Sequence, residues 1–394
     1  MVSFGEELLL ILRRVVYLCL ISLFMLIKIS VGFASPDLEK LTAQAVILIE
    51  ADTGKVIYEK NAEKKMYPAS TTKIMTTILA LEKSNLNDVI MVSENAAGTE
   101  GSSMQLATGD QLPMIDALYG IMMLSGNDAS IAVAEHISGL VENFAALMNE
   151  KAQRLGAFHT HFANSCGLPD PNHYTTAHDL ARIGAYAYKN PMFREIIKTQ
   201  YKSFSWREYQ APVLFENTNL LLGNYQGING MKTGYTEAAG ECLVASAERD
   251  GVNLIAVVLH CAQDYRWYEA AALLDYGFEK VTMETMVTKE GSSTFVRVDD
   301  GISYRVKASP NEDIKIAVSN GDRNRYALQL EVPTVRAPVR KGQAVGKINV
   351  LYGEEVVRQI DLLAEEDVEA GFNIFAKVAG LFYDVIQWAR SAME

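Results

Sequence analysis

The chain has few of the features that bind metals, nucleotides or nucleic acids. No Cys-x-x-Cys pair and no glycine-rich phosphate-binding loop occurs among its 394 residues. Acidic residues outnumber basic ones, 48 against 36, and the formal net charge is −12. A protein of this charge repels a phosphate backbone. We therefore expect no cofactor and no nucleic-acid partner.

Histidine is also scarce, and the spacing of the six histidines does not suit a metal site. His159 and His161 are two residues apart, and His173 and His178 are five apart. Neither spacing places two ligands and an acid on one helix face, as a His-Glu-x-x-His motif does. We expect these side chains to be hydrogen-bonded polar residues and predict no metal centre.

Four cysteines are present, and one of them, Cys19, lies in the N-terminal segment described next. The remaining Cys166, Cys242 and Cys261 are odd in number, which excludes a complete disulfide framework. Cys242 and Cys261 fall on two predicted neighbouring strands and could pair. Buried free thiols are the simpler interpretation.

Residues 1–34 have the pattern of a secretory signal peptide. Two arginines precede an apolar stretch over residues 15–27, and Gly32 and Ala34 place small residues where a signal peptidase reads them. We expect cleavage after Ala34 and export across the cytoplasmic membrane. An uncleaved anchor is the alternative, because the segment before the apolar stretch is long and Lys28 interrupts the apolar run.

Residues 35–283 are predicted to form one α/β (α+β) domain, in which an antiparallel sheet packs with a helical subdomain. Strand patterning flanks a mostly helical region that runs from about residue 110 to 191. The expected strands cover residues 45–49, 56–58, 232–235, 241–248 and 252–260. The expected helices start near Ser70 or cover residues 112–124, 129–137, 142–155, 175–188 and 264–276.

Residues 284–364 change in character and indicate a small all-β sandwich. Short alternating apolar and polar stretches are separated by polar turns, and no helical pattern interrupts them. The expected strands cover residues 294–298, 303–308, 314–318, 327–332, 344–351 and 355–362.

Residues 365–394 predict an amphipathic helix. The stretch is too short and too polar to span a bilayer, but an interfacial helix lying on the membrane suits it. The alternative is a helix packed on its own protein or on a dimer partner. The residues that share the apolar face are Ile374, Phe375, Val378, Leu381, Phe382, Val385, Ile386 and Ala389.

The chemistry is expected around Ser70 and Lys73. Positions three apart on a helix share a face, so Lys73 would lie beside the Ser70 hydroxyl. An amine in an apolar environment loses proton affinity, and a neutral lysine can take the proton of a serine. Free backbone N–H groups at a helix start can stabilise an oxyanion. Ser-x-x-Lys alone is common by chance, however.

Two further motifs follow, each in the context that its chemistry needs: a turn between helices and the start of a strand. Together, and in this order, the three match the serine acyltransferases that bind penicillin. The motifs are Ser70-Thr71-Thr72-Lys73, Ser125-Gly126-Asn127 and Lys232-Thr233-Gly234.

The chain as a whole resembles the low-molecular-mass penicillin-binding proteins, the serine-type D-alanyl-D-alanine carboxypeptidases. The resemblance covers nearly the whole chain, and residues 173–177, 179–181, 217–220 and 227–240 support it. It implies a serine β-lactamase/transpeptidase-like catalytic domain and a role in the cell wall. It also implies peptidoglycan stem peptides ending in D-Ala-D-Ala as substrates and β-lactam antibiotics as covalent inhibitors.

The resemblance assigns catalytic roles to three residues. Ser70 would attack the penultimate D-Ala carbonyl, and Lys73 would accept its proton. Ser125 would relay that proton toward the leaving amine. The backbone N–H groups of Ser70 and Tyr235 would form the oxyanion hole. Tyr235 stands where the family often has histidine, but the backbone role does not depend on that side chain.

The remaining assignments concern substrate binding. Asn127 would bond to Lys73 or to the substrate amide, and Lys232 and Thr233 suit the terminal carboxylate of the peptide. Gly234 completes the third motif, and Arg266 matches a family arginine that helps to hold the same carboxylate. An exposed helix arginine is the alternative for Arg266.

Three other functions share these motifs. A β-lactamase of this motif order needs a glutamate that activates water, and Glu216 lies too close before Lys232 to suit that role. A DD-endopeptidase cannot be separated by motif, although a carboxylate clamp favours a free C-terminus. A non-catalytic penicillin-binding wall sensor is disfavoured because every catalytic position is intact.

Overall fold

The computed structural model describes residues 37–204, 214–372, 374 and 378–380. The predicted signal peptide and most of the predicted C-terminal helix lie outside these residues. Among the described residues no single helix is long and apolar enough to cross a membrane, although the bent pair Asn127–Ser138 and Val141–Arg154 passes by length and composition.

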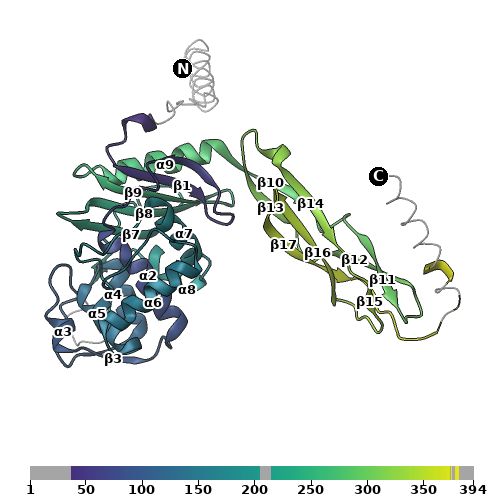
Figure 1. The fold of residues 1–394 in the computed structure, drawn as a ribbon, viewed down its shortest axis with the longest axis horizontal. Coiled ribbons are helices and arrows are strands. Elements are labelled where there is room, and N and C mark those ends of the chain that lie inside the picture. Colours follow the sequence, from purple (N-terminus) through teal and green to yellow (C-terminus); the bar gives the residue numbers. More distant parts are fainter. Residues whose placement is uncertain (1–36, 205–213, 373, 375–377, 381–394) are drawn as a thin grey trace, which may run out of the picture. The chain divides into compact units, whose positions relative to one another are not determined.

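A five-stranded antiparallel sheet forms the centre of the first domain, with the strand order β2-β1-β9-β8-β7 (Figure 1). All six residues of β1 are buried, because both faces of the sheet are covered. Ile47 packs into the core on one face and Leu48 into the core on the other. The strands are β1 (Ala45–Glu50), β2 (Val56–Lys60), β7 (Ile228–Thr236), β8 (Gly240–Arg249) and β9 (Val252–Cys261).

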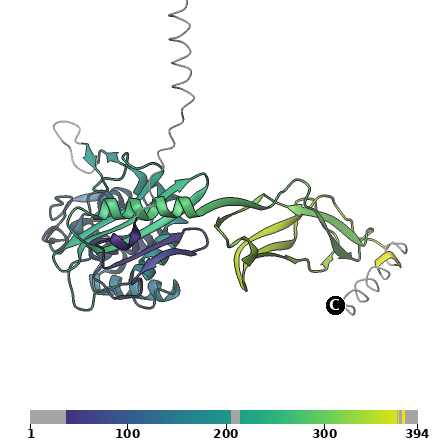
Figure 2. The same ribbon diagram turned by 90° about the horizontal axis from the view of Figure 1, so that it is seen from above.

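Helices cover both faces of this sheet. The helix α9 (Arg266–Lys280) lies along one face (Figure 2), and the helices that precede β7 in the chain lie on the other. At its centre is α2 (Lys73–Lys83), whose first eight residues are all buried. The others are α3 (Glu94–Ala97), α4 (Met114–Met123), α5 (Asn127–Ser138), α6 (Val141–Arg154), α7 (Ala177–Tyr188) and α8 (Pro191–Lys198).

Most of the elements expected in this domain are confirmed, and several details differ. Ser70 lies in a 3₁₀ turn, Ala69–Thr72, that leads directly into α2. The predicted helix over residues 112–124 begins as the short strand β4 (Gln111–Pro113), which pairs with β3 (Val89–Met91). The helix α8 was not expected, because the mostly helical region was predicted to end at about residue 191. Proline suits the first turn of a helix, and the preceding asparagine caps this one.

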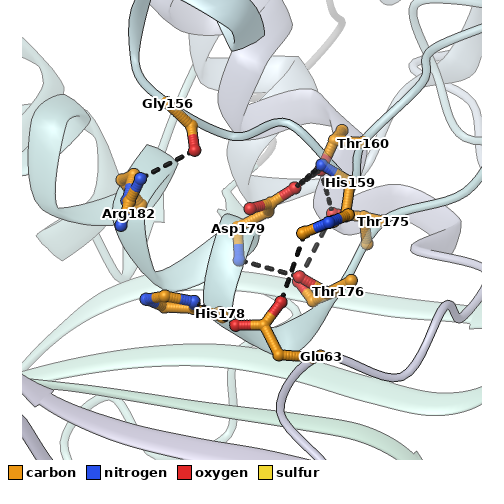
Figure 3. A network of polar contacts seen from close by, with 9 residues as sticks. All are labelled: Glu63, Gly156, His159, Thr160, Thr175, Thr176, His178, Asp179 and Arg182. Carbon is orange, nitrogen blue, oxygen red and sulfur yellow. Dashed lines mark hydrogen bonds and ion pairs between the residues drawn. The ribbon is translucent and has the colours of Figure 1, made fainter.

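A polar network fixes the loop between α6 and α7 (Figure 3). The Thr176 hydroxyl caps α7 by accepting the Asp179 N–H, and Asp179 Oδ2 accepts the His159 N–H at 2.8 Å and the Thr160 hydroxyl at 2.7 Å. Arg182 donates to the Gly156 carbonyl at 2.7 Å. The loop that continues from these anchors reaches the Ser70 turn.

The second domain is all-β, as expected. A two-stranded sheet of β10 (Val281–Val287) and β13 (Ile314–Ser319) and a six-stranded sheet both contribute apolar side chains to one core. Beyond β17, Val368 bridges to Val339 and Ala370 to Gly301. The six-stranded sheet contains β11 (Thr294–Asp299), β12 (Arg305–Pro310), β14 (Tyr326–Glu331), β15 (Val335–Arg336), β16 (Ala344–Tyr352) and β17 (Glu355–Ala364).

The three described cysteines, Cys166, Cys242 and Cys261, are free and buried. Burial raises the pKa of the Cys242 thiol to about 11 and raises that of Cys261 further. These residues therefore behave as small apolar side chains, and the alternative of a Cys242–Cys261 disulfide is not realised.

One buried carboxylate ties the start of the described chain to α9. Glu269, with 1% of its surface exposed, accepts the Thr42 hydroxyl at 2.6 Å and the Ala43 N–H at 3.0 Å. It also accepts the Thr42 N–H. Three donors therefore depend on one side chain, and the Ala43 N–H is the one that is buried.

We expect Glu269→Ala to lower the free energy of unfolding by about 1–3 kcal/mol, because it leaves the buried Ala43 N–H without an acceptor. Chemical denaturation followed by circular dichroism measures this change. Glu279→Ala, at a half-exposed position in the last turn of the same helix, is the matched control. Equal stability of the two variants would contradict the prediction.

Candidate active site

Ser70 lies in a tight turn that presents its side chain at the entrance to α2. Ala69, just before it, has a φ of +47°, a conformation that non-glycine residues rarely adopt. The Thr71 hydroxyl donates to the Pro68 carbonyl at 2.7 Å and holds the turn closed. Such local strain is typical of functional sites, where the surrounding structure maintains it.

Lys73 is buried directly beside this serine. Its Nζ lies 3.0 Å from Ser70 Oγ, 2.6 Å from Asn127 Oδ1 and 2.7 Å from the Cys166 carbonyl. Burial lowers the pKa of Lys73 to about 8, against the opposing effect of Asp128. The amine is therefore neutral in about one molecule in ten at pH 7, and its contact with Ser70 is the one that a general base requires.

The loop after α6 supports the Ser70 turn from one side. Cys166, to which we assigned no role, contributes its backbone carbonyl to Lys73. Gly167 has a φ of +90°, and a Cβ there would lie 1.9 Å from the Ala69 carbonyl oxygen. Any larger residue at position 167 would therefore displace the Ser70 turn. The spacing of motifs carries no signal for a contact of this kind.

His173 connects the end of the same loop to the catalytic turn. The Ala163 N–H donates to His173 Nδ1 at 3.1 Å, so the ring proton is on Nε2, which contacts Thr72 Oγ1 at 2.8 Å. Burial lowers the pKa of His173 to about 4 and keeps the ring neutral. This histidine is a satisfied polar residue, as expected, and it fixes the residue next to Lys73.

The second motif lies between α4 and α5. Ser125 is buried and has a φ of +62°. Asn127 accepts from Lys73 and donates from Nδ2 to the Glu100 carbonyl at 2.7 Å. The loop that contains Glu100 is held in turn by Asp128, which accepts the Ser103 hydroxyl at 2.6 Å and the Met104 N–H at 3.0 Å.

The third motif lies on β7, at one edge of the central sheet. A Cβ on Gly234 would lie 3.2 Å from the backbone nitrogen of Ser70, so the strand packs closely against the nucleophile. Lys232 is fully buried, and its Nζ donates to the Thr233 carbonyl at 2.9 Å. Burial lowers the pKa of Lys232 strongly, and Lys73 and Arg266 lower it further. Tyr235 is 63% exposed.

Thr218 and Arg266 add polar groups beside β7. Thr218 Oγ1 lies 3.0 Å from Thr233 Oγ1, and the Thr218 N–H donates to the Met123 carbonyl at the end of α4. Arg266, the first residue of α9, donates to the Gly234 carbonyl at 3.2 Å, and only 19% of its side chain is exposed. Sequence reasoning did not identify Thr218 as part of the site.

The glutamate of the β-lactamase alternative lies in a different setting. Glu216 belongs to the short strand β6 (Phe215–Glu216), which pairs with β5 (Tyr201–Lys202). Its carboxylate accepts the Tyr201 hydroxyl at 3.1 Å. The described contacts of Glu216 are therefore with β5 and not with the Ser70 turn.

Comparisons with known proteins agree with this geometry. The sequence pattern of the D-alanyl-D-alanine carboxypeptidase family matches residues 32–263, and that of the C-terminal domain of penicillin-binding protein 5 matches residues 282–370. D-alanyl-D-alanine carboxypeptidase DacF of Bacillus subtilis is 33% identical over 93% of this chain and 97% of its own. The DacC enzyme of Escherichia coli is 35% identical, over 85% and 86%.

Solved structures are similar as well. Penicillin-binding protein 5 of Haemophilus influenzae matches with a TM-score of 0.64 and 31% identity over 84% of this chain and 98% of its own. Penicillin-binding protein 3 of Streptococcus pneumoniae matches with a TM-score of 0.73 and 25% identity, over 84% and 100%. With two matching domains and relatives aligned over nearly their whole length, the chain belongs to the D-alanyl-D-alanine carboxypeptidase family of penicillin-binding proteins.

Proposed function

We propose that the protein removes the terminal D-alanine from peptidoglycan stem pentapeptides through an acyl-enzyme on Ser70. The observation that carries the proposal is the contact of the buried Lys73 amine with Ser70 Oγ at 3.0 Å. Burial lowers the pKa of this amine to about 8, which makes it a base suited to neutral pH. The family of the chain supports the same activity.

Acylation begins when Ser70 Oγ attacks the penultimate D-Ala carbonyl and Lys73 takes the hydroxyl proton. The oxyanion that forms is stabilised by the backbone N–H groups of Ser70 and Tyr235, which the packing of Gly234 on the Ser70 turn brings into one region. When the peptide bond breaks, Ser125 passes a proton to the amine of the leaving D-alanine. Water then hydrolyses the ester on Ser70 and restores the enzyme.

The far end of the substrate carries a carboxylate, and the third motif is suited to bind it. Thr233 offers a hydroxyl, and Arg266 offers guanidinium N–H groups at the same end of β7. The permanent positive charge at this end comes from Arg266, since burial disfavours the charged form of Lys232. β-Lactams carry a carboxylate beside their reactive amide, so the same residues would orient these inhibitors for attack by Ser70. A clamp for a free carboxylate also favours a carboxypeptidase over an endopeptidase.

The domain organisation extends this proposal to the membrane surface. Residues 1–34 are a signal peptide, 35–283 the catalytic domain, 284–364 the β-sandwich and 365–394 a membrane-anchoring helix. The mature chain is then exported and lies on the outer face of the cytoplasmic membrane. The exposed Phe372 supports this arrangement, because it is 77% exposed at the start of the apolar stretch.

We expect Ser70→Ala to abolish D-alanine release from diacetyl-Lys-D-Ala-D-Ala and covalent labelling by penicillin. The variant lacks the hydroxyl that receives the acyl group. The purified ectodomain, residues 35–369, is assayed for free D-alanine beside Ser138→Ala, a control at the end of α5. Labelling without release in the unmodified protein would indicate an endopeptidase or a sensor. Release that persists in Ser70→Ala would exclude Ser70 as the nucleophile.

The pH dependence of acylation reports the state of Lys73. Only the neutral amine accepts a proton, so a pKa of about 8 predicts that acylation accelerates about tenfold between pH 7 and pH 9. Lys73→Arg cannot lose its proton and is expected to acylate at least about 100-fold more slowly. Stopped-flow measurement with a fluorescent penicillin tests both. Lys83→Arg, exposed at the end of α2, is the control, and a flat profile would contradict the assignment.

We expect residues 365–394 to bind membranes by burying apolar side chains in the lipid. From Asp361 onward the chain has seven acidic and two basic residues, so attraction to anionic lipid contributes little. Mature protein should sediment with phosphatidylglycerol vesicles, and added salt at about 0.5 M should not release it. Deletion of residues 370–394 should abolish sedimentation and leave D-alanine release from a soluble peptide unchanged. Release by salt, or sedimentation of the shortened protein, would contradict this prediction.

A further inference from the structure

A buried carboxylate lies directly beside the proposed carboxylate clamp. Glu241 is the second residue of β8 and pairs with Tyr235 across the β7–β8 ladder. Its side chain is 11% exposed, and Oε2 accepts the Asp264 N–H at 3.0 Å. The same oxygen lies 3.6 Å from Arg266 Nε. Glu241 therefore contacts both the turn that precedes α9 and the arginine that begins the helix.

Glu241 acts on Arg266 through its charge more than through a hydrogen bond. Arg266 Nε is buried without a hydrogen-bond partner among the described residues, and 3.6 Å exceeds an ordinary hydrogen-bond length. The guanidinium also donates to the Gly234 carbonyl and lies over the Trp267 ring, 4.7 Å from its centroid. These contacts hold the arginine at the end of β7 beside Thr233.

Arg266 carries a permanent positive charge beside Glu241, whereas burial lowers the pKa of both Lys73 and Lys232. A terminal carboxylate that binds here experiences Arg266 and Glu241 together. The acid weakens the attraction that the arginine alone would exert, and it does so at low exposure, where water screens little.

We propose that Glu241 acts through Arg266 and sets the strength of the carboxylate clamp: its negative charge, 3.6 Å from Arg266 Nε, limits how tightly the clamp binds a terminal carboxylate. The inference rests on the proposed role of Arg266. Its consequence is a clamp that orients the substrate and yet releases the leaving D-alanine, which carries the same carboxylate. Removal of the charge alone would shift the enzyme toward tighter binding of substrate and product.

Glu241→Gln removes the negative charge and keeps the size of the side chain. The amide oxygen can still accept the Asp264 N–H. Kinetics are measured with diacetyl-Lys-D-Ala-D-Ala and with its C-terminal amide, which lacks the negative charge. We expect Glu241→Gln to lower KM for the acid about fivefold and to leave KM for the amide unchanged. Inhibition by free D-alanine should strengthen by a similar factor. Glu237→Gln, an exposed charge in the adjacent turn, is the control and should change neither constant.

The double variant Arg266→Ala/Glu241→Gln completes the test. Arg266→Ala alone should raise KM for the acid, and adding Glu241→Gln should then have no further effect. If Arg266→Ala raises KM for the acid but Glu241→Gln leaves the ratio of the two KM values, acid to amide, unchanged, the role of Glu241 is refuted. The carboxylate clamp is then still supported. Equal effects of Glu241→Gln and Glu237→Gln would also refute it. If Arg266→Ala leaves KM for the acid unchanged, the clamp and this inference both fail, and the Ser70→Ala experiment still decides the activity.

Discussion

The site depends on one unfavourable arrangement, the burial of the Lys73 amine. A lysine without access to water gives up its proton more easily, and this one is enclosed by Ser70, Asn127 and the Cys166 carbonyl. Each of these three partners comes from a different part of the chain. The helix α2, the turn before α5 and the loop after α6 must therefore all be in place before the amine becomes a base. The environment that lowers the pKa of Lys73 therefore forms only when these three segments have folded together.

Other energetically unfavourable features lie close to this amine. Ala69 and Ser125 both have positive φ values, and each lies at or beside a serine of the site. Lys232 is a second buried base whose charged form is disfavoured. Strain and buried charge of this kind are maintained only where the surroundings are rigid. The fully buried β1 and the two apolar cores that it separates provide that rigidity.

The sequence was sufficient for the architecture and for the three motifs, because both depend on local patterns. Alternation and helical periodicity identified the central strands, most of the helices and the all-β second domain. Each of the three motifs is a contiguous stretch, so it can be recognised in the sequence before the fold is known. Gly167, His173, Thr218 and Glu241 were not identified as parts of the site, because they act through backbone packing or through contacts between segments distant in the chain. The helix α8 was missed because the helical region was predicted to end at about residue 191, whereas the Asn190 cap begins a new helix there.

The pairing of β1 with β9 has a consequence for how the protein is made. Residues 45–50 pair with residues 254–259, so about two hundred further residues must be synthesised before the central ladder can close. Contacts that are this distant in sequence slow folding, because a long loop must be ordered first. Until then β1, an unbroken apolar strand, has an unpaired edge. Closure of the central sheet is thus a late event in the folding of this domain, and the chain is most prone to aggregate before it.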